Sequence, residues 1–302
     1  MNCTLQHVVV TGTSSGIGHA TALRLAQAGW HVYAGVRRPE DGVALRAAAG
    51  TGALTPLRID VTDAAQIGAA VHTVDEHVGA AGLNALVDNA GIGVAWPVEF
   101  VPLEALRSQF EVNVFGQIAV TQAFLPLLRQ AVGRIVVIGS IGDRITMPFG
   151  GPLSASKCAI GSLTDALRQE LAPWGIRVVL LAPASIHSDA VDKLERDAQK
   201  AVDEFPPKAV GLYRQTYLGM IHAAAARERR GSPPGVVADT VLKALSTRRP
   251  RARYQVGKDA RLLAALGRYF PASVLDALRR RVFRLPKAGS RATDVNREGA
   301  QR

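Results

Sequence analysis

A chain of 302 residues with 48% hydrophobic side chains is long enough for one large globular domain and is not typical of a disordered protein. No apolar run reaches the ~18 residues of a membrane-spanning helix, and no charged leader precedes an apolar segment. The two cysteines, Cys3 and Cys158, are too few for a disulfide framework, and the histidines lack the spacing of metal ligands. We therefore expect a cytoplasmic protein without a metal site.

The net charge of +11 is distributed unevenly along the chain. Residues 241–302 hold 16 Lys and Arg against 4 Asp and Glu, so the basic excess belongs to the C-terminal part. Such a tail can meet an acidic partner, an anionic membrane or nucleic acid, but we favour a solvated face. Nucleic acid is excluded as the preferred partner because the tail has few aromatic residues and no recognisable binding module.

A glycine-rich turn follows the first apolar stretch of the chain. Residues 5–10 indicate a buried strand, residues 11–18 spell T-G-T-S-S-G-I-G, and helical periodicity begins near Ala20. Glycine allows turn conformations and close approach of a ligand, and the N-terminus of a helix attracts anions. The order strand, glycine turn, helix therefore predicts a phosphate cradle. The residues assigned to it are Gly12, Ser14, Ser15, Gly16, Ile17 and Gly18.

The residues after the second expected strand, 30–36, indicate which dinucleotide is preferred. A site that prefers NAD places an acidic residue there to bind the ribose hydroxyls, whereas this chain continues with Arg37 and Arg38. A guanidinium group suits a phosphate because it forms paired, charge-assisted hydrogen bonds. We predict NADP(H) in preference to NAD(H), with Arg37 on the 2′-phosphate. The alternative is an exposed basic turn before Pro39.

Strands and helices alternate through most of the remaining chain. Further strands are expected at 53–59, 83–87, 135–138, 176–181 and 253–256, and helices at about 64–78, 102–130, 153–171, 235–245, 260–269 and 272–284. This alternation predicts an α/β fold, with a doubly wound parallel sheet of about seven strands and helices on both faces. Ligands bind at the carboxyl ends of such strands. The residues at those ends are Arg37, Asp60, Asn89, Ser140 and Pro183.

Residues 184–230 interrupt the alternation with a charged helical excursion, in which helices are expected at 189–201 and 209–227. Its position after the sixth strand predicts a lid over the ligand pocket. We expect one dinucleotide-binding domain over residues 1–257, lid included. Residues 258–302 would form a basic helical extension with a frayed end.

Several motifs in one order resemble the short-chain dehydrogenase/reductase family over residues 5–256. They are T-G-T-S-S-G-I-G from Thr11, D-V at Asp60, D-N-A-G from Asp88, the asparagine of E-V-N-V-F-G at Asn113, Ser140, and S-A-S-K ending at Lys157. The resemblance implies a Rossmann-type enzyme that moves hydride between NAD(P) and an alcohol or ketone, and a homodimer or homotetramer. Two mild departures are Asp88, where the family has asparagine, and Ala184, where it has glycine.

The same resemblance assigns roles to individual residues. Ser140 would bind the substrate oxygen, Asn113 would support a water-linked proton path, and Lys157 would hold the nicotinamide ribose and lower the pKa of a tyrosine. Residues 183–188 would wrap the nicotinamide, and Asp60 would meet the adenine. The cofactor contacts implied beyond the glycine turn and Arg37 are Asp60, Val61, Asn89, Ala90, Gly91, Lys157, Pro183 and Ile186.

One position departs seriously from the family's Tyr-x-x-x-Lys motif. Four residues before Lys157 the chain has Leu153, and the spacing from Ser140 leads to the same residue. The positions share one helical face, but leucine has no proton to exchange. General acid–base catalysis contributes typically about 100- to 10,000-fold, and its usual donor is missing here.

Three hypotheses follow from Leu153. In the first, the protein is an active oxidoreductase in which Tyr213, Tyr217 or His187 moves the proton. In the second, it is a pseudoenzyme that binds NADP(H) and has a sensing or scaffold role. In the third, the leucine is an engineered or erroneous residue in an otherwise ordinary enzyme.

The C-terminal part resembles one branch of the family. R-R-P-R-A-R-Y-Q-V-G-K-D-A from Arg248 and F-P-A-S-V-L-D-A-L from Phe270 are similar to retinol and 17-beta-hydroxysteroid dehydrogenases, which implies a bulky lipophilic substrate. The segment 275–285 combines apolar residues with three consecutive arginines, so it could lie on an anionic bilayer. We favour the alternative that its apolar side closes the substrate pocket or forms a subunit contact.

Overall fold

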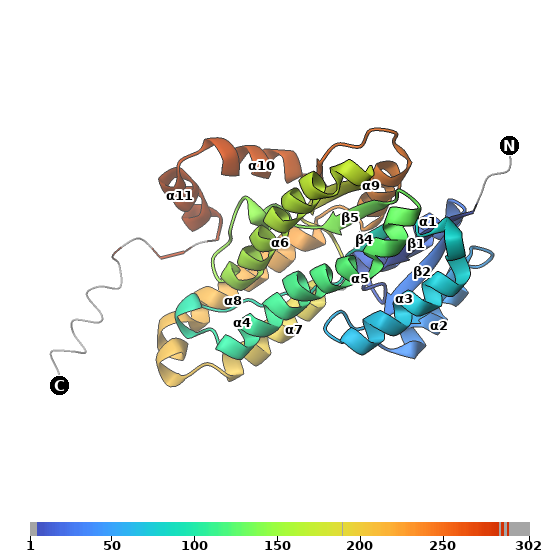
Figure 1. The fold of residues 1–302 in the computed structure, drawn as a ribbon. Coiled ribbons are helices and arrows are strands. Elements are labelled where there is room, and N and C mark those ends of the chain that lie inside the picture. The colour runs from blue at the N-terminus through green and yellow to red at the C-terminus, as the bar shows by residue number, and fades with distance from the viewer. Residues whose placement is uncertain (1–4, 189, 284, 287–288, 290–302) are drawn as a thin grey trace.

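Seven parallel strands form the centre of the fold in the computed structural model, which describes residues 5–188, 190–283, 285, 286 and 289 (Figure 1). Their order across the sheet is β3-β2-β1-β4-β5-β6-β7. The strands are β1 (Gln6–Val10), β2 (Trp30–Val36), β3 (Leu54–Arg58), β4 (Ala85–Asp88), β5 (Arg134–Ile138), β6 (Arg177–Pro183) and β7 (Arg253–Val256). The doubly wound parallel sheet predicted from the sequence is confirmed, with strand ends shifted by one to two residues.

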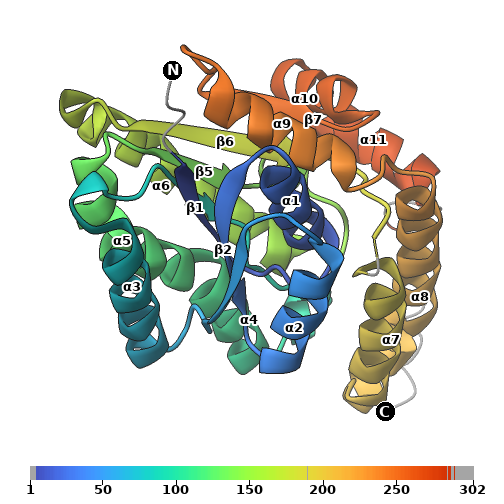
Figure 2. The ribbon, with the colours of Figure 1, turned by 90° about the vertical axis from the view of Figure 1, so that its right-hand side faces the viewer.

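Helices cover both faces of the sheet (Figure 2). One face is covered by α1 (Gly16–Gln27), α2 (Pro39–Ala48) and α9 (Gly235–Ser246), and the other by α3 (Ala64–Val78), α5 (Gln117–Gln130) and α6 (Gly151–Glu170). The strands are apolar at consecutive positions because both faces are buried. In β1, for example, Val8 and Val10 pack toward α1, whereas Val9 packs toward α3 and α5.

Two local features differ from the sequence prediction. The helix expected at 102–130 consists of α4 (Leu103–Phe110), a π-helical segment (Glu111–Gly116) and α5. The helix α2 was not predicted, although Pro39 at its first position and the acidic Glu40 and Asp41 in its first turn are typical of a helix start. At the start of α3, the Asp63 carboxylate accepts from the backbone amides of Ala65 and Gln66 and so caps the helix.

The excursion after β6 forms two helices that pack against each other, α7 (Ala190–Asp203) and α8 (Pro207–Arg229). Two further helices follow β7, namely α10 (Ala260–Tyr269) and α11 (Ala272–Val282). A third hydrophobic cluster, separate from the two that flank the sheet, joins α7 and α8 to the loop after β4. Short 3-10 helices lie at Gly79–Ala81, Val98–Phe100, Ile141–Asp143 and Ala172–Trp174. Within the described residues, no helix is both long and apolar enough to cross a membrane.

Candidate functional site

The turn between β1 and α1 has the backbone conformation that its glycines predict. Gly12 has φ +67° and Gly16 has φ +59°, which are left-handed values that residues with a Cβ rarely adopt. A Cβ on Gly12 would lie 2.8 Å from the Cα of Ala90, and one on Gly18 would collide with the Gly12 carbonyl oxygen. The first N–H groups of α1 have no acceptor one turn back. The cradle therefore fits the phosphates of a dinucleotide, held by backbone N–H groups at a positive helix end.

The loop after β4 is locked onto this turn through Thr11. The Thr11 hydroxyl oxygen accepts from the backbone N–H groups of Asn89 (2.9 Å) and Ala90 (3.0 Å). The Asn89 side-chain amide donates to the carbonyl oxygens of Thr11 (2.9 Å) and Gly12 (3.0 Å). The structure thus brings 89–91 beside the glycine turn, as expected for a cofactor site. Sequence reasoning gave Thr11 no role of its own, because its partners lie almost 80 residues away.

The two arginines after β2 have different surroundings. The guanidinium of Arg38 donates to the carboxylate of Asp41 at 2.9 and 3.1 Å, at the start of α2. Arg37 is exposed and has no ion pair within the described residues. Of the two, Arg37 is therefore the guanidinium available to an incoming phosphate. At the end of β3, one Asp60 carboxylate oxygen accepts from the backbone and hydroxyl of Thr62, and Val61 is buried.

Asp88, at the end of β4, is a buried carboxyl group. One of its oxygens accepts from the Thr121 hydroxyl at 2.7 Å, whereas the other has no hydrogen-bond partner among the residues that the structure describes. Burial raises the pKa of Asp88 to about 7, and the Thr121 hydrogen bond opposes this only in part. The substitution of the family's asparagine thus places an ionisable group directly behind the cofactor loop.

Asn113 and Lys157 lie deep in the site. Asn113 sits in the π-helical segment, and its amide forms two hydrogen bonds with the backbone of Ile92, accepting from N–H (2.8 Å) and donating to the carbonyl oxygen (3.0 Å). The Lys157 side chain is 8% exposed and its ammonium donates to the carbonyl oxygen of Ile138 at 2.8 Å. Burial lowers the pKa of Lys157 to about 8, and the charge of Asp143 opposes the shift.

Ser140 ends β5, and the loop that follows it is fixed by a buried ion pair. The Ser140 hydroxyl oxygen accepts from the N–H of Gly142 at 2.9 Å. Asp143 accepts from the Arg253 guanidinium with both oxygens at 2.6 Å, and its side chain is almost fully buried. Because Arg253 lies on β7, the edge strand of the sheet holds the loop that carries Ser140. Sequence reasoning gave neither Asp143 nor Arg253 a role, because they lie 110 residues apart.

Leu153 stands one helical turn before Lys157 in α6, and the hydroxyls of the two tyrosines considered as proton donors bond to other residues. The Tyr217 side chain is fully buried and its hydroxyl donates to the carbonyl oxygen of Ala95 at 2.9 Å. The Tyr213 hydroxyl donates to Glu99 at 2.8 Å. Burial also raises the pKa of Tyr217. Both hydroxyls thus donate to acceptors in the segment between β4 and α4.

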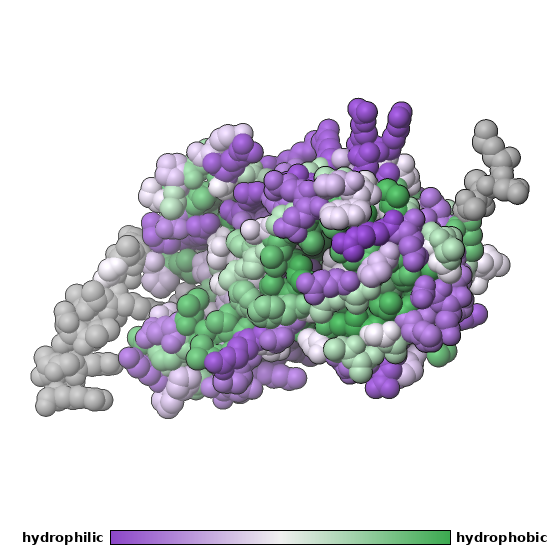
Figure 3. Space-filling view, viewed as in Figure 1, coloured by the Kyte–Doolittle hydropathy of each residue, from purple (hydrophilic) through white to green (hydrophobic). Residues whose placement is uncertain are grey.

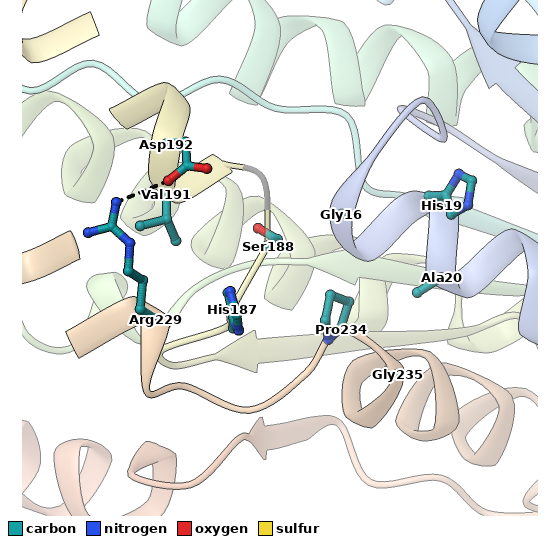
Figure 4. A pocket seen from close by; sticks show the side chains of 10 residues that line it. All are labelled: Gly16, His19, Ala20, His187, Ser188, Val191, Asp192, Arg229, Pro234 and Gly235. Carbon is teal, nitrogen blue, oxygen red and sulfur yellow. Dashed lines mark hydrogen bonds and ion pairs between the residues drawn. The ribbon is translucent and has the colours of Figure 1, made fainter. Parts of the chain in front are cut away.

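A cavity of about 430 Å³ lies between the glycine turn and the segment after β6, and His187 is one of the residues that line it (Figure 4). Its lining includes Gly16, Ser188 and the first residue of α9. A Cβ on Gly16 would lie 3.7 Å from the Ser188 hydroxyl oxygen, so Ser188 lies close to the turn at one edge of this cavity. His187 thus faces the phosphate side of the site, and the cavity lining does not include Ser140 or Lys157.

Residues at the end of the lid form hydrogen bonds with the segment after β6. Ile186 forms an isolated parallel bridge with Ser232, and the Ile186 N–H donates to the Glu228 carboxylate at 3.1 Å. The Arg227 guanidinium donates to the Ser185 hydroxyl oxygen at 3.3 Å and pairs with Asp259 at 3.0 Å. Burial raises the pKa of Glu228. Sequence reasoning placed Ile186 at the nicotinamide but missed Glu228, 42 residues further along the chain.

An aromatic cluster fills the space between α8 and the loops after β4 and β5. Trp96 packs against Phe205, and the Tyr217 ring contacts both Phe205 and Phe149, with ring centroids 4.9 to 5.4 Å apart. A Cβ on Gly93 would lie 3.9 Å from Leu153, so the leucine borders the loop that leads into this cluster.

The comparison with known families decides the assignment. The family model of the short chain dehydrogenases matches residues 6–199. The chain belongs to this family of oxidoreductases. Its Rossmann-type fold and its glycine turn are those of the family. Among the described residues, no group of three or more His, Cys, Asp or Glu side chains could hold a metal ion.

Relatives place the chain in one branch of the short-chain dehydrogenases. An NADPH-dependent 3-dehydrocapnine reductase of Ornithobacterium rhinotracheale is 33% identical over 279 residues, covering 91% of this chain and 96% of the relative. Estradiol 17-beta-dehydrogenase 2 of Mus musculus is 34% identical over 281 residues (89% and 72%), and retinol dehydrogenase 5 of Homo sapiens is 34% identical over 277 residues (90% and 86%). The chain is thus a member of the branch that contains retinol and 17-beta-hydroxysteroid dehydrogenases.

A solved structure shares the fold over nearly the whole chain. The crystal structure of a short chain dehydrogenase from Burkholderia cenocepacia in complex with NADP superposes with a TM-score of 0.68 at 27% identity. The superposition covers 93% of this chain and 99% of that one.

Proposed function

We propose that this protein is an NADP(H)-dependent oxidoreductase of lipophilic, steroid- or retinoid-like alcohols or ketones, with an active site that lacks the family tyrosine. The observation that carries the proposal is the glycine cradle of 12–18 with the exposed, unpaired Arg37 at the neighbouring strand end. The NADPH dependence of one relative and the NADP bound in one solved structure support the same choice of cofactor.

The remaining residues of the site fit a hydride transfer supplied by the nicotinamide. Lys157 presents a buried ammonium that has donated one hydrogen bond to Ile138 and has two further N–H groups for ribose hydroxyls. Ser140 offers a hydroxyl to a substrate oxygen, and Asn113 holds the loop at Ile92 that borders the cofactor. A proton must still reach the substrate oxygen, and the leucine at 153 cannot provide it.

Support for a lipophilic substrate comes from the lid. The aromatic cluster between α8 and the loops after β4 and β5 contains Trp96, Phe149 and Phe205, and Leu153 borders the loop that carries Trp96. Apolar and aromatic linings with few polar groups are typical of sites for such ligands.

Substitution of each arginine tests the cofactor preference. Arg37→Ala should weaken NADPH binding about 10- to 100-fold and leave NADH binding almost unchanged, because only NADPH carries the 2′-phosphate. Arg38→Ala is the matched control, since Arg38 already pairs with Asp41. Fluorescence titrations of the three proteins with NADPH and NADH give the six dissociation constants. A wild type that binds NADH more tightly than NADPH would rule the preference out.

The second candidate function, a pseudoenzyme that binds NADP(H) without turnover, is favoured by one observation. The hydroxyls of Tyr213 and Tyr217 already donate to Glu99 and to the carbonyl oxygen of Ala95, and His187 lines the cavity at the glycine turn, whose lining does not include Lys157.

Leu153→Tyr separates the two functions. In a pseudoenzyme, the variant should gain reduction of lipophilic ketones by about 100-fold or more, because it restores the acid–base group. In an enzyme that uses a different proton donor, the wild type is active and the tyrosine slows it. Ketone-dependent NADPH oxidation measures both, and unchanged NADPH affinity is the control for folding.

A further inference from the structure

A second cavity lies at the start of β6, whereas the glycine turn lies at the edge where the strands end. Its volume is about 390 Å³, and its lining comes from the end of α6, the start of β6 and the turn before β7. We call it the basic cavity, and its lining includes Arg168, Arg177, Val178, Pro250 and Ala252. The volume is in the range of about 300 to 1,000 Å³ that is usual for small-ligand sites.

Two guanidinium groups line the basic cavity, and none of its described lining residues is acidic. Arg168 donates through Nη2 to Asp165 at 3.1 Å, but its buried Nε has no hydrogen-bond partner among the described residues. Arg177 is exposed and forms no ion pair within the described part of the chain. A buried donor without an acceptor is destabilising, so both arginines have N–H groups available to an anion in the cavity.

Further positive charge lies around the basic cavity. Burial lowers the pKa of Arg134, and the charge of Arg177, its neighbour in the register of β5 and β6, lowers it further. Residues 247–252, which connect α9 to β7, hold three exposed arginines and no acidic residue. In Figure 3, hydrophilic side chains project from the edge of the molecule beside α9, the helix that leads into this segment. A bound anion would offset the repulsion between these cations.

The sheet adds a backbone donor to the basic cavity. The ladder between β6 and β7 begins at Leu180, whose N–H donates to the carbonyl oxygen of Ala252 at 2.9 Å. The backbone N–H groups of a strand point alternately to its two neighbours, so the N–H of Val178 points to the same side as that of Leu180. β7 has no residue in the ladder opposite Val178. Because Val178 lines the cavity, its N–H is a third donor there.

These donors fit a phosphate group. The planar fork of arginine forms paired, charge-assisted hydrogen bonds with phosphate oxygens, and a phosphate monoester carries a charge of about −1.5 to −2 at neutral pH. We propose that the basic cavity binds a small phosphorylated compound, with its phosphate held by Arg168, Arg177 and the Val178 N–H. This inference does not depend on the proposed catalytic function, because the glycine turn and Arg37 lie at the other ends of the strands.

Calorimetric titration of the full chain with inorganic pyrophosphate tests the proposal. At low salt, the wild type should bind one pyrophosphate in this cavity with a dissociation constant below about 1 mM. Arg168→Gln with Arg177→Gln should weaken this binding at least about tenfold, because charge-assisted hydrogen bonds are lost. Ala252→Trp keeps every charge but fills the cavity, and it should abolish the binding. Pyrophosphate bound at the glycine turn would be the same in all variants, so the differences report on the basic cavity alone.

Matched controls lie outside the basic cavity. Arg261→Gln removes an exposed arginine of α10, and Ala47→Trp adds a tryptophan at an exposed position of α2; both should bind like the wild type. Thermal unfolding followed by circular dichroism verifies that each variant is folded. The proposal is overturned if the wild type binds no more pyrophosphate than the double arginine variant. It is also overturned if Ala252→Trp binds as well as Ala47→Trp, because the binding then depends on surface charge and not on the cavity.

Discussion

Asp88 is the residue whose ionisation has the clearest consequence for the fold. Its pKa is raised to about 7 by burial, whereas an aspartate in the unfolded chain titrates near 4. Between these two pH values the folded state binds more protons than the unfolded state, so stability falls as the pH rises. The contribution of protonated Asp88 to the free energy of unfolding is fully present below about pH 4 and is lost as the pH rises through about 7.

Asp88→Asn should remove this dependence. The amide keeps an acceptor for the Thr121 hydroxyl and cannot ionise, so at pH 8 the variant should be more stable than the wild type by on the order of 3 kcal/mol. At pH 4 the two should be nearly equal. Urea unfolding at both pH values measures the difference, with the exposed Asp75→Asn as the control. Equal stabilities at pH 8 would mean that Asp88 stays charged at little cost.

At the scale of elements, the segment after β6 is held from behind by the last turn of α8. The Glu228 carboxylate accepts from the Ile186 N–H. On either side of Ile186, the Ser185 carbonyl oxygen accepts from the Ser232 N–H, and the His187 N–H donates to the Ser232 carbonyl oxygen. If the glycine turn holds the cofactor as proposed, Glu228 would act on it through Ile186 as a positioning residue. Direct hydrogen bonds therefore connect the end of the lid to the segment after β6.

Removal of the Glu228 acceptor should loosen the cofactor site. Glu228→Ala should raise the dissociation constant for NADPH about fivefold, the effect of one lost hydrogen bond. Glu228→Gln retains an acceptor oxygen and should remain within twofold of the wild type. Fluorescence titration of the three proteins checks this. If the glutamine variant binds as weakly as the alanine variant, the acceptor is not what Glu228 contributes.

At the scale of the whole molecule, the sequence predicts the sheet well because parallel strands buried on both faces are short apolar runs between turn residues. Their carboxyl ends meet at one edge, so Asn89, Ser140 and Pro183 could be placed together in advance. The π-helical register around Asn113 could not be predicted, because side-chain periodicity hardly changes over six residues. The partners of Tyr213, Tyr217 and Glu228 also depend on how the lid packs, and no local pattern encodes that packing.

The central claim is that the turn after β1, with Arg37, binds the phosphates of NADPH. A calorimetric titration of the wild-type chain with NADPH tests it without any assumption about substrate or turnover. The account predicts saturable binding of one NADPH per chain at micromolar concentration. An absence of binding at millimolar NADPH, in a protein shown to be folded, would contradict it.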